Sequence, residues 1–244
     1  MPHSEIDPAI YYWGTPVVLI TTVNEDGTHN VAPMSSAWWL GTRCMLGLSG
    51  ESQTTLNLYD VHTVFSETYL LTRHSLRTKQ CVLNLASDNM TEVVNALART
   101  TGTSTVPPGK IQRGYRHVKD KFAIANLHSQ NSTFVSPSRI QECPVQMEAE
   151  LCEVHHFLDP SIPQLFAPKA IEVKILKTYV LDEIRLAEHK NRIDPDKWKP
   201  LIMMFQHLYG LKNGKAAESV LAECEEEMYR LPPEQPNAGC LKPE

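Results

Sequence analysis

The sequence lacks the short motifs that mark the commonest nucleotide-binding, hydrolytic and metal-dependent enzymes. It contains neither a G-x-G-x-x-G nor a Walker A pattern, so a Rossmann or P-loop nucleotide site is excluded. No G-x-S-x-G elbow is present, which argues against a hydrolase of that type. No H-E-x-x-H pattern and no paired Cys or His ligand spacing occurs, and we therefore expect no metal site.

The sequence also has little that points to a membrane, to nucleic acid or to an oxidising compartment. The formal net charge of -5 gives no basic excess for an anionic partner. No apolar run approaches the ~20 residues of a spanning helix, and the first residues do not have the pattern of a signal peptide. The 6 cysteines are scattered without a Cys-x-x-Cys pair, which favours reduced thiols in a chain of 244 residues. We expect a cytoplasmic protein that binds neither nucleic acid nor membrane.

What the sequence does contain is a series of apolar runs separated by turn residues. The runs span residues 17–23, 31–40 and 44–48. Asp26-Gly27 between the first two supplies the positive φ that a tight hairpin requires, and Gly41 separates the second run from the third. The runs are rich in Val, Ile, Thr and Trp, which are common in strands. This pattern predicts an antiparallel meander.

A polar cluster, residues 50–55, follows the third apolar run and leads into Leu56 and Asn57. The cluster predicts a strand-to-helix junction, where free backbone N–H groups and the positive end of the helix dipole favour a phosphate. A simpler interpretation is that Ser52 or Thr54 only caps the helix. The residues alone leave both interpretations open.

The remaining elements are predicted from periodicity and capping signals. Residues 145–157 and 170–186 alternate in part between apolar and polar side chains and predict two paired strands. A helix is predicted to begin near Asp88, where Asn89 and Glu92 have the spacing of a capping box, and another is predicted over residues 117–125. A further apolar helical face covers residues 217–231.

Taken in order, several of these segments resemble the flavin reductase-like, FMN-binding split-barrel family. The resemblance rests on Asp26-Gly27 with residues 30–36 (NVAPMSS), on Ser52-x-Thr54-x-x-Asn57 and on residues 81–85 (CVLNL), with fainter echoes at Lys121-Phe122, 142–148 and 192–194. It implies a mainly β fold, an antiparallel split β-barrel of the Greek-key type with six or seven strands and peripheral helices. Residues 1–212 would form the barrel domain with an atypical insertion at 60–79, and residues 213–244 a C-terminal helix and tail.

The resemblance also implies where a flavin binds. The cofactor-binding candidates are Met34, Ser35 and Ser36 along the isoalloxazine, Ser52, Gln53, Thr54 and Asn57 around the phosphate, and Asn84 near the ring. Many relatives carry Lys or Arg in the phosphate segment, where this chain has Glu51 and Gln53. A strand with a proline bulge is the alternative for residues 32–36, and a strand-to-helix cap is the alternative for Asn84. His189 is a candidate for binding nicotinamide or substrate, with a solvated loop as its alternative.

The implied function is NAD(P)H-dependent reduction of FMN, with FAD as the alternative flavin, by hydride transfer from nicotinamide to flavin N5. Because this chemistry needs stacking and orientation, no catalytic side chain is assigned. A homodimer and a partner monooxygenase are the implied interactions. Two alternatives stay open: an FMN-binding carrier or sensor without reductase turnover, and a flavin-dependent oxidase or oxygenase of a small organic substrate.

Overall fold

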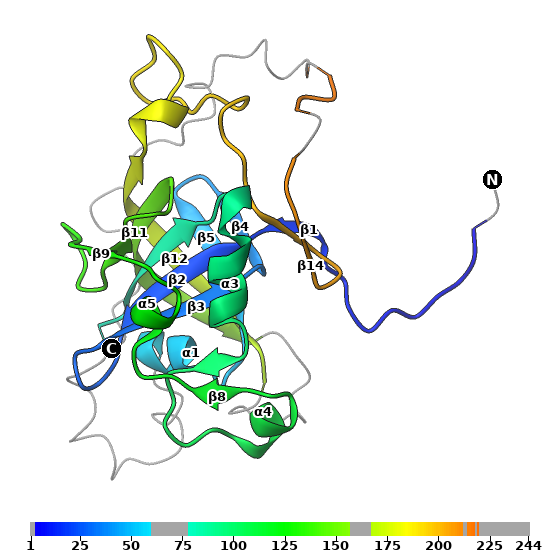
Figure 1. Cartoon of the computed structure of the whole chain (residues 1–244), viewed down its shortest axis with the longest axis vertical. Coiled ribbons are helices and arrows are strands. Elements are labelled where there is room, and N and C mark those ends of the chain that lie inside the picture. The colour runs from blue at the N-terminus through cyan, green and yellow to red at the C-terminus, as the bar shows by residue number, and fades with distance from the viewer. Residues whose placement is uncertain (1–2, 60–77, 157–166, 212–213, 218, 220–244) are drawn as a thin grey trace.

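The computed structural model describes residues 3–59, 78–156, 167–211, 214–217 and 219 (Figure 1). Its main element is a seven-stranded antiparallel sheet with the strand order β3-β2-β6-β11-β12-β5-β4. These strands are β2 (Val18–Val23), β3 (His29–Met34), β4 (Ala37–Leu40), β5 (Arg43–Leu48), β6 (Gln80–Leu85), β11 (Val145–His156) and β12 (Lys169–Val180). The prediction of a mainly β fold with six or seven antiparallel strands is confirmed.

The two edge strands of this sheet are consecutive in the chain. β3 and β4 lie at opposite ends of the strand order, yet only Ser35 and Ser36 separate them. In a flat sheet, six strand spacings of about 4.8 Å would put these edges roughly 29 Å apart, whereas the link from Met34 to Ala37 spans roughly 11 Å at most. The sheet must therefore curl until its two edges meet without pairing, which is the geometry of a split barrel. We call residues 34–36 the seam segment.

Two hydrophobic clusters pack on opposite faces of the curved sheet. β2 shows the division, because Val18 and Ile20 belong to the first cluster and Leu19 belongs to the second. The first cluster fills the barrel interior with residues that include Leu46, Leu48, Cys81, Leu83, Met147, Ala149, Ile171 and Val173. The second packs the outer face against α3 (Thr91–Leu97) through Val94 and Leu97. Burial on both faces explains why β2 reads as an unbroken apolar run.

Short helices and small sheets surround the barrel. In the described part of the chain, the other helices are α1 (Gln53–Leu58), α4 (Pro108–Gln112), α5 (Lys121–Ile124), and the 3-10 turns η3 (Asp88–Met90) and η4 (Asp182–Ile184). The small sheets are β1 (Trp13–Pro16) with β13 (Ile202–Met204) and β14 (His207–Tyr209), β7 (Thr100–Thr101) with β8 (Arg116–His117), and β9 (Ser129–Gln130) with β10 (Arg139–Ile140). In Figure 1, α3 and α5 lie over β2 and β3, and residues 3–12 leave the body as an extended arm.

Three predictions of local structure are wrong. The run 31–40 is two strands at opposite sheet edges, so β3 and β4 do not pair and the meander is broken. The predicted capping box at Asn89 and Glu92 does not form, because η3 precedes α3 and no side chain caps α3. The helix expected over 117–125 is confined to α5, whose N-cap Asp120 accepts from the backbone N–H of Ala123.

Other predictions hold or fall outside the described residues. The strand pair expected over 145–157 and 170–186 is confirmed as β11 and β12, except that β12 ends at Val180 and η4 occupies part of the remainder. The insertion 60–79 and the C-terminal helix lie outside the described residues, apart from residues 78, 79, 214–217 and 219, which are not helical. Within the described segments, no helix is long and apolar enough to cross a membrane.

The cysteines only partly agree with the expectation of reduced thiols. Cys44, Cys81 and Cys143 are buried free thiols, and burial raises the pKa of each, to about 12 for Cys44. Cys152 is disulfide-bonded, so the expectation is wrong at that residue.

Candidate functional site

The seam segment lies directly beside the end of β5. The backbone carbonyl of Ser36 accepts a hydrogen bond of 2.7 Å from Gly47 N, and the Ser36 hydroxyl lies 2.9 Å from the Tyr12 hydroxyl. A Cβ at Gly47 would stand 2.8 Å from Ser36 Cβ, so this close approach requires glycine. Because β5 ends at Leu48 and leads into α1, this strand connects the predicted ring-binding segment with the predicted phosphate-binding segment.

Ser52 has the capping role that the sequence left open. Its Oγ accepts a hydrogen bond of 3.1 Å from Thr55 N and lies 2.8 Å from the Thr55 hydroxyl. The Thr55 hydroxyl in turn donates to the Ser49 carbonyl at 2.8 Å. These contacts satisfy one of the free N–H groups at the start of α1. The binding of a phosphate by Ser52 stays a prediction.

Asn57 and Gln53 hold α1 against the sheet. Asn57 Nδ2 donates to Thr22 Oγ1 and to Asn24 Oδ1, each at 2.9 Å. Asn57 Oδ1 accepts from Gln53 Nε2 at 2.7 Å. Since Asn57 is 2% exposed and all of its amide atoms are paired within the fold, its first role is structural.

Asn30 presents an unsatisfied acceptor beside α1. Its Nδ2 donates to Thr54 Oγ1 at 3.2 Å, but its buried Oδ1 has no hydrogen-bond partner among the described residues. A Cβ at Gly102 would lie 3.0 Å from both Asn30 Oδ1 and Gln53 Cγ, and the Thr103 hydroxyl donates to Gln53 Oε1 at 2.9 Å. The loop that contains Gly102 therefore covers α1. A buried acceptor without a donor is costly, which makes Asn30 Oδ1 a candidate ligand contact.

Two buried lysines add positive charge to the same region. Lys110 Nζ donates to the Glu51 carbonyl and Lys121 Nζ to the Val31 carbonyl, each at 2.9 Å. Lys110 is 7% exposed and Lys121 3% exposed. Neither ammonium group forms an ion pair with a carboxylate in the described part of the chain.

The pKa values of these two lysines are lowered. Burial is the main cause for both, and it brings the pKa of Lys121 to about 8, with a further contribution from the nearby charge of Lys110. The charge of Glu51 acts in the opposite direction on the pKa of Lys110. Two buried, mutually repelling ammonium groups that form no ion pair within the described residues destabilise the fold, and a bound anion would offset that cost.

The sequence prediction missed this source of charge. The resemblance points to a basic residue in the phosphate segment, where this chain has Glu51 and Gln53. The structure instead brings in Lys110 from α4, which approaches the Glu51 carbonyl, and Lys121 from α5, which approaches β3. Lys121 stood in one of the fainter echoes of the family, whereas nothing in the Pro-Gly-Lys sequence around Lys110 signals a site.

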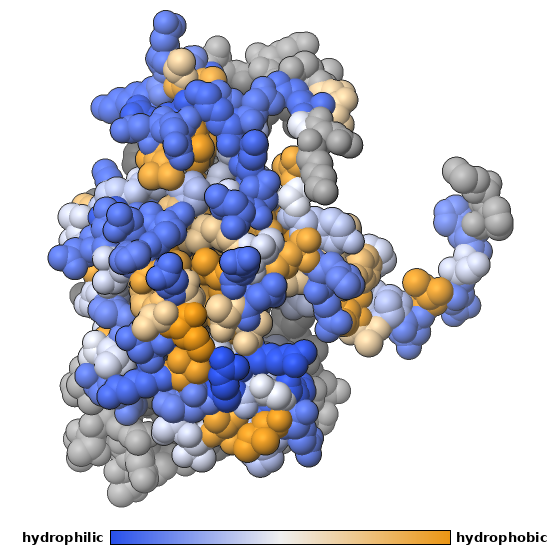
Figure 2. Space-filling model, viewed as in Figure 1, coloured by the Kyte–Doolittle hydropathy of each residue, from blue (hydrophilic) through white to orange (hydrophobic). Residues whose placement is uncertain are grey.

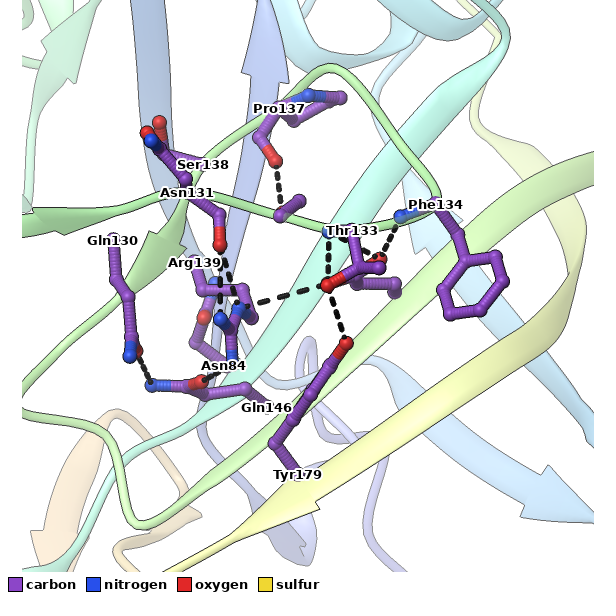
Figure 3. A network of polar contacts seen from close by, with 12 residues as sticks. Asn84, Gln130, Asn131, Thr133, Phe134, Pro137, Ser138, Arg139, Gln146 and Tyr179 are labelled. Atoms are coloured by element: carbon purple, nitrogen blue, oxygen red, sulfur yellow. Dashed lines mark hydrogen bonds and ion pairs between the residues drawn. The ribbon is translucent and has the colours of Figure 1, made fainter.

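Asn84 and His189 are not brought to this region by any described hydrogen bond. Asn84 is fully buried, donates to the Leu19 carbonyl and accepts from Ile140 N, each at 2.9 Å. In Figure 3 it lies in the polar network around Arg139. His189 is exposed in a turn after η4. Their ligand roles stay predictions, and for Asn84 the structure supplies an internal use of its amide.

A comparison with known sequences identifies a family. No family model matches the chain. The chain is 39% identical over 207 residues to YdfE, an uncharacterized protein of Bacillus subtilis (strain 168), and the match covers 85% of this chain and 88% of YdfE. The chain belongs to the YdfE family. The name of this relative states no activity, so we compared the fold of the chain with solved structures.

Solved structures give that fold. Flavoredoxin of Desulfovibrio vulgaris (Miyazaki F) matches with a TM-score of 0.62 at 16% identity, covering 92% of this chain and all (100%) of flavoredoxin. Nitrilotriacetate monooxygenase component B from Bacillus cereus matches with a TM-score of 0.61 at 15% identity, and the match covers 89% of this chain and 100% of component B. A Shewanella frigidimarina NCIMB 400 protein, described as a flavin reductase with a split barrel domain, matches with a TM-score of 0.58 at 15% identity. The match covers 84% of this chain and 86% of that protein. The YdfE-family chain therefore has the flavin reductase-like split-barrel fold, as the resemblance implied.

Proposed function

We propose that this protein is an FMN-binding oxidoreductase that reduces flavin with NAD(P)H. The observation that carries the proposal is the pair of buried lysines near α1 and β3, Lys110 and Lys121, which form no ion pair with a carboxylate among the described residues of a flavin reductase-like fold. A phosphate supplies the missing negative charge, and FMN carries one. The names of the structural neighbours, flavin reductase, flavoredoxin and monooxygenase component B, support a flavin as the ligand.

The chain offers suitable groups for each part of such a ligand. Lys110 and Lys121 would neutralise the phosphate, together with backbone N–H groups near Ser52. Asn30 Oδ1 can accept from a hydroxyl group of the ligand. The seam segment, Met34 to Ser36, presents amides and hydroxyls to the edge of a ring. Residues that fit a phosphate and residues that fit a polar ring are therefore available on adjoining segments.

The role of these side chains is to bind and to orient. When bound, a flavin supplies the acceptor for a hydride from the nicotinamide. The seam segment would fix the plane of the ring and exclude water from one of its faces, which lowers the entropic cost of a reactive approach. No described side chain has to give or take a proton for this, so we assign no catalytic side chain. The neighbour that is a monooxygenase component also supports delivery of reduced flavin to a partner monooxygenase.

FMN titration with added nicotinamide tests the function. We expect saturable quenching of FMN fluorescence at one FMN per chain, and FMN-dependent loss of NADH or NADPH absorbance. Quenching of FMN fluorescence without oxidation of NADH or NADPH would indicate a flavin carrier or sensor and not a reductase. Oxygen uptake that depends on an organic substrate would favour an oxidase or oxygenase. If FMN is neither quenched nor reduced at high concentration, the proposal is wrong.

We further propose that the working unit is a homodimer in which the exposed aromatic surface near the seam is covered by a second copy. Trp13 is 64% exposed and Trp38 is 56% exposed, and the Trp13 ring packs edge-on against Phe205 with centroids 4.6 Å apart. Figure 2 shows hydrophobic residues among hydrophilic ones along the N-terminal arm, which extends away from the body. Tyr12, at the base of this arm, contacts Ser36 of the seam segment, so the surface is continuous with the candidate site.

Sedimentation velocity tests the dimer. The wild-type chain is expected to sediment at twice the mass of one chain. Leu40→Lys places a charge on a side chain that is 70% exposed at the end of edge strand β4, so it should dissociate the dimer without unfolding the barrel. A wild-type chain that sediments as a monomer would contradict the proposal, as would a Leu40→Lys chain that stays dimeric with unchanged FMN affinity.

A further inference from the structure

Three potential metal ligands come together on the β11–β12 ribbon. Glu153 and His155 are two residues apart on β11 and so face the same side of the sheet. Glu172 lies directly opposite Glu153 on β12. His155 Nε2 lies 3.1 Å from Glu172 Oε2, and His155 Nδ1 lies 4.0 Å from Glu153 Oε1. One donor atom from each of the three residues lies within 4.8 Å of the other two.

The arrangement of charge favours a cation between these side chains. Two carboxylates directly opposite on neighbouring strands repel each other and destabilise the pairing. Arg43 Nη1 lies 3.1 Å from Glu172 Oε1 and compensates one of the two negative charges. Among Glu153, Glu172 and Arg43, one negative charge remains when His155 is neutral. The second oxygen of Glu172 faces the imidazole rather than the guanidinium, so it is oriented for a ligand on that side.

We propose that Glu153, His155 and Glu172 bind a divalent transition-metal ion of the zinc type. Imidazole nitrogen and carboxylate oxygen are both ligands of Zn²⁺, and three protein ligands with a water in the fourth position make a stable open site. Arg43 then holds Glu172 in place from behind, as outer-shell partners of metal ligands do. The side chains of Glu153 and His155 are 53% and 40% exposed, which gives an ion access from solvent.

This site is separate from the proposed flavin site. Glu172 pairs with Met45, and Arg43 begins β5, whereas α1 follows the other end of β5 at Leu48. Five residue steps along a strand correspond to roughly 16 Å. A metal here would cross-link β11 and β12. Only Glu153-x-His155 is visible as a local pattern in the sequence, because Glu172 comes from the other side of a hairpin.

Zn²⁺ binding to the full chain tests the proposal. The protein is treated with a chelator, desalted and titrated with Zn²⁺ alone in a calorimeter. We expect one Zn²⁺ per chain at this site, and a loss of affinity of at least about tenfold in Glu153→Gln and in His155→Ala. Neither side chain is buried, so both variants should fold, and unchanged thermal unfolding without metal would verify that.

His128→Ala is the matched control. His128 Nδ1 contacts Glu142 Oε1 on the protein surface, so it offers one imidazole and one carboxylate without the second carboxylate. Zn²⁺ affinity that is equal in wild type, His128→Ala, Glu153→Gln and His155→Ala would overturn the site and leave an ion-pair network only. FMN quenching should be the same in all four proteins, so failure of flavin binding would count against the proposed function and not against the metal site.

Discussion

Replacing Lys121 with methionine is expected to raise the Kd for FMN by about tenfold to a hundredfold. A hydrogen bond to a charged group contributes about 1.5 to 3 kcal/mol, and each 1.4 kcal/mol or so is a factor of ten in Kd. Methionine is apolar and similar in length, so it fills the space of the buried lysine stem without its charge. FMN fluorescence titration of wild type and Lys121→Met measures the difference.

Lys119→Met is the control for this prediction. Lys119 stands two residues before Lys121 and is exposed, so its replacement removes the same formal charge from the surface of the chain. Screening by salt and water makes a distant surface charge weak, and the Kd for FMN should change by less than about threefold. Equal Kd values in Lys121→Met and Lys119→Met would remove Lys121 from the proposed phosphate site.

The same variant should change the pH dependence of stability and of binding. Burial lowers the pKa of Lys121 to about 8 in the folded protein from 10.5, so between these values the unfolded chain binds more protons than the folded chain. The free energy of unfolding of the wild type should therefore rise with pH across this window relative to Lys121→Met, by on the order of 3 kcal/mol. FMN affinity has the opposite trend and should fall above pH 8, because the lysine loses its positive charge. Urea denaturation and FMN titration across this pH range measure both trends.

The positions of the strands could be predicted from the sequence better than the pairing between strands could. Alternation and turn residues placed β2, β5, β11 and β12 closely, with Gly27 and Gly41 both at positive φ in the hairpins. The run 31–40 predicts one strand, because nothing local in Ser35-Ser36 shows that the chain crosses from one sheet edge to the other. That crossing depends on the pairing of β3 and β4 with different strands, which is a non-local property.

The candidate site shows the same limit. The sequence predicted Ser52, Thr54 and Asn57 as phosphate-binding residues, and in the structure their side chains have capping or packing contacts. Polar residue types at a strand-to-helix junction fit both a phosphate and an internal network, and only the contacts distinguish the two. The charge came from Lys110 and Lys121, which lie more than 50 residues beyond α1 in sequence and are brought back by the fold.

Replacing Arg139 with methionine is expected to cost about 3 to 5 kcal/mol of folding free energy, because it strands a buried carboxylate. Glu148 is fully buried and accepts from the backbone N–H groups of Thr133 and Phe134, at 2.9 and 2.6 Å. Arg139 Nε, 3.5 Å from Glu148 Oε1, is its partner of opposite charge. Figure 3 shows Arg139 stacked over Tyr179, 3.9 Å from the guanidinium carbon to the ring centroid. Urea denaturation measures the loss.

Two further variants decide whether the stranded charge is the cause. Arg185→Met removes an exposed ion pair with Asp182 of 2.9 Å, and such a pair contributes about 1 kcal/mol or less to folding. If Arg139→Met and Arg185→Met lose equal folding free energy, the stranded carboxylate is not the cause. Glu148→Gln added to Arg139→Met keeps an oxygen that can accept from the backbone amides but carries no charge. The double variant should therefore recover much of the stability lost by Arg139→Met. If it is less stable still, the hydrogen bonds and the stacking on Tyr179 dominate, and the carboxylate charge is not the source of the loss.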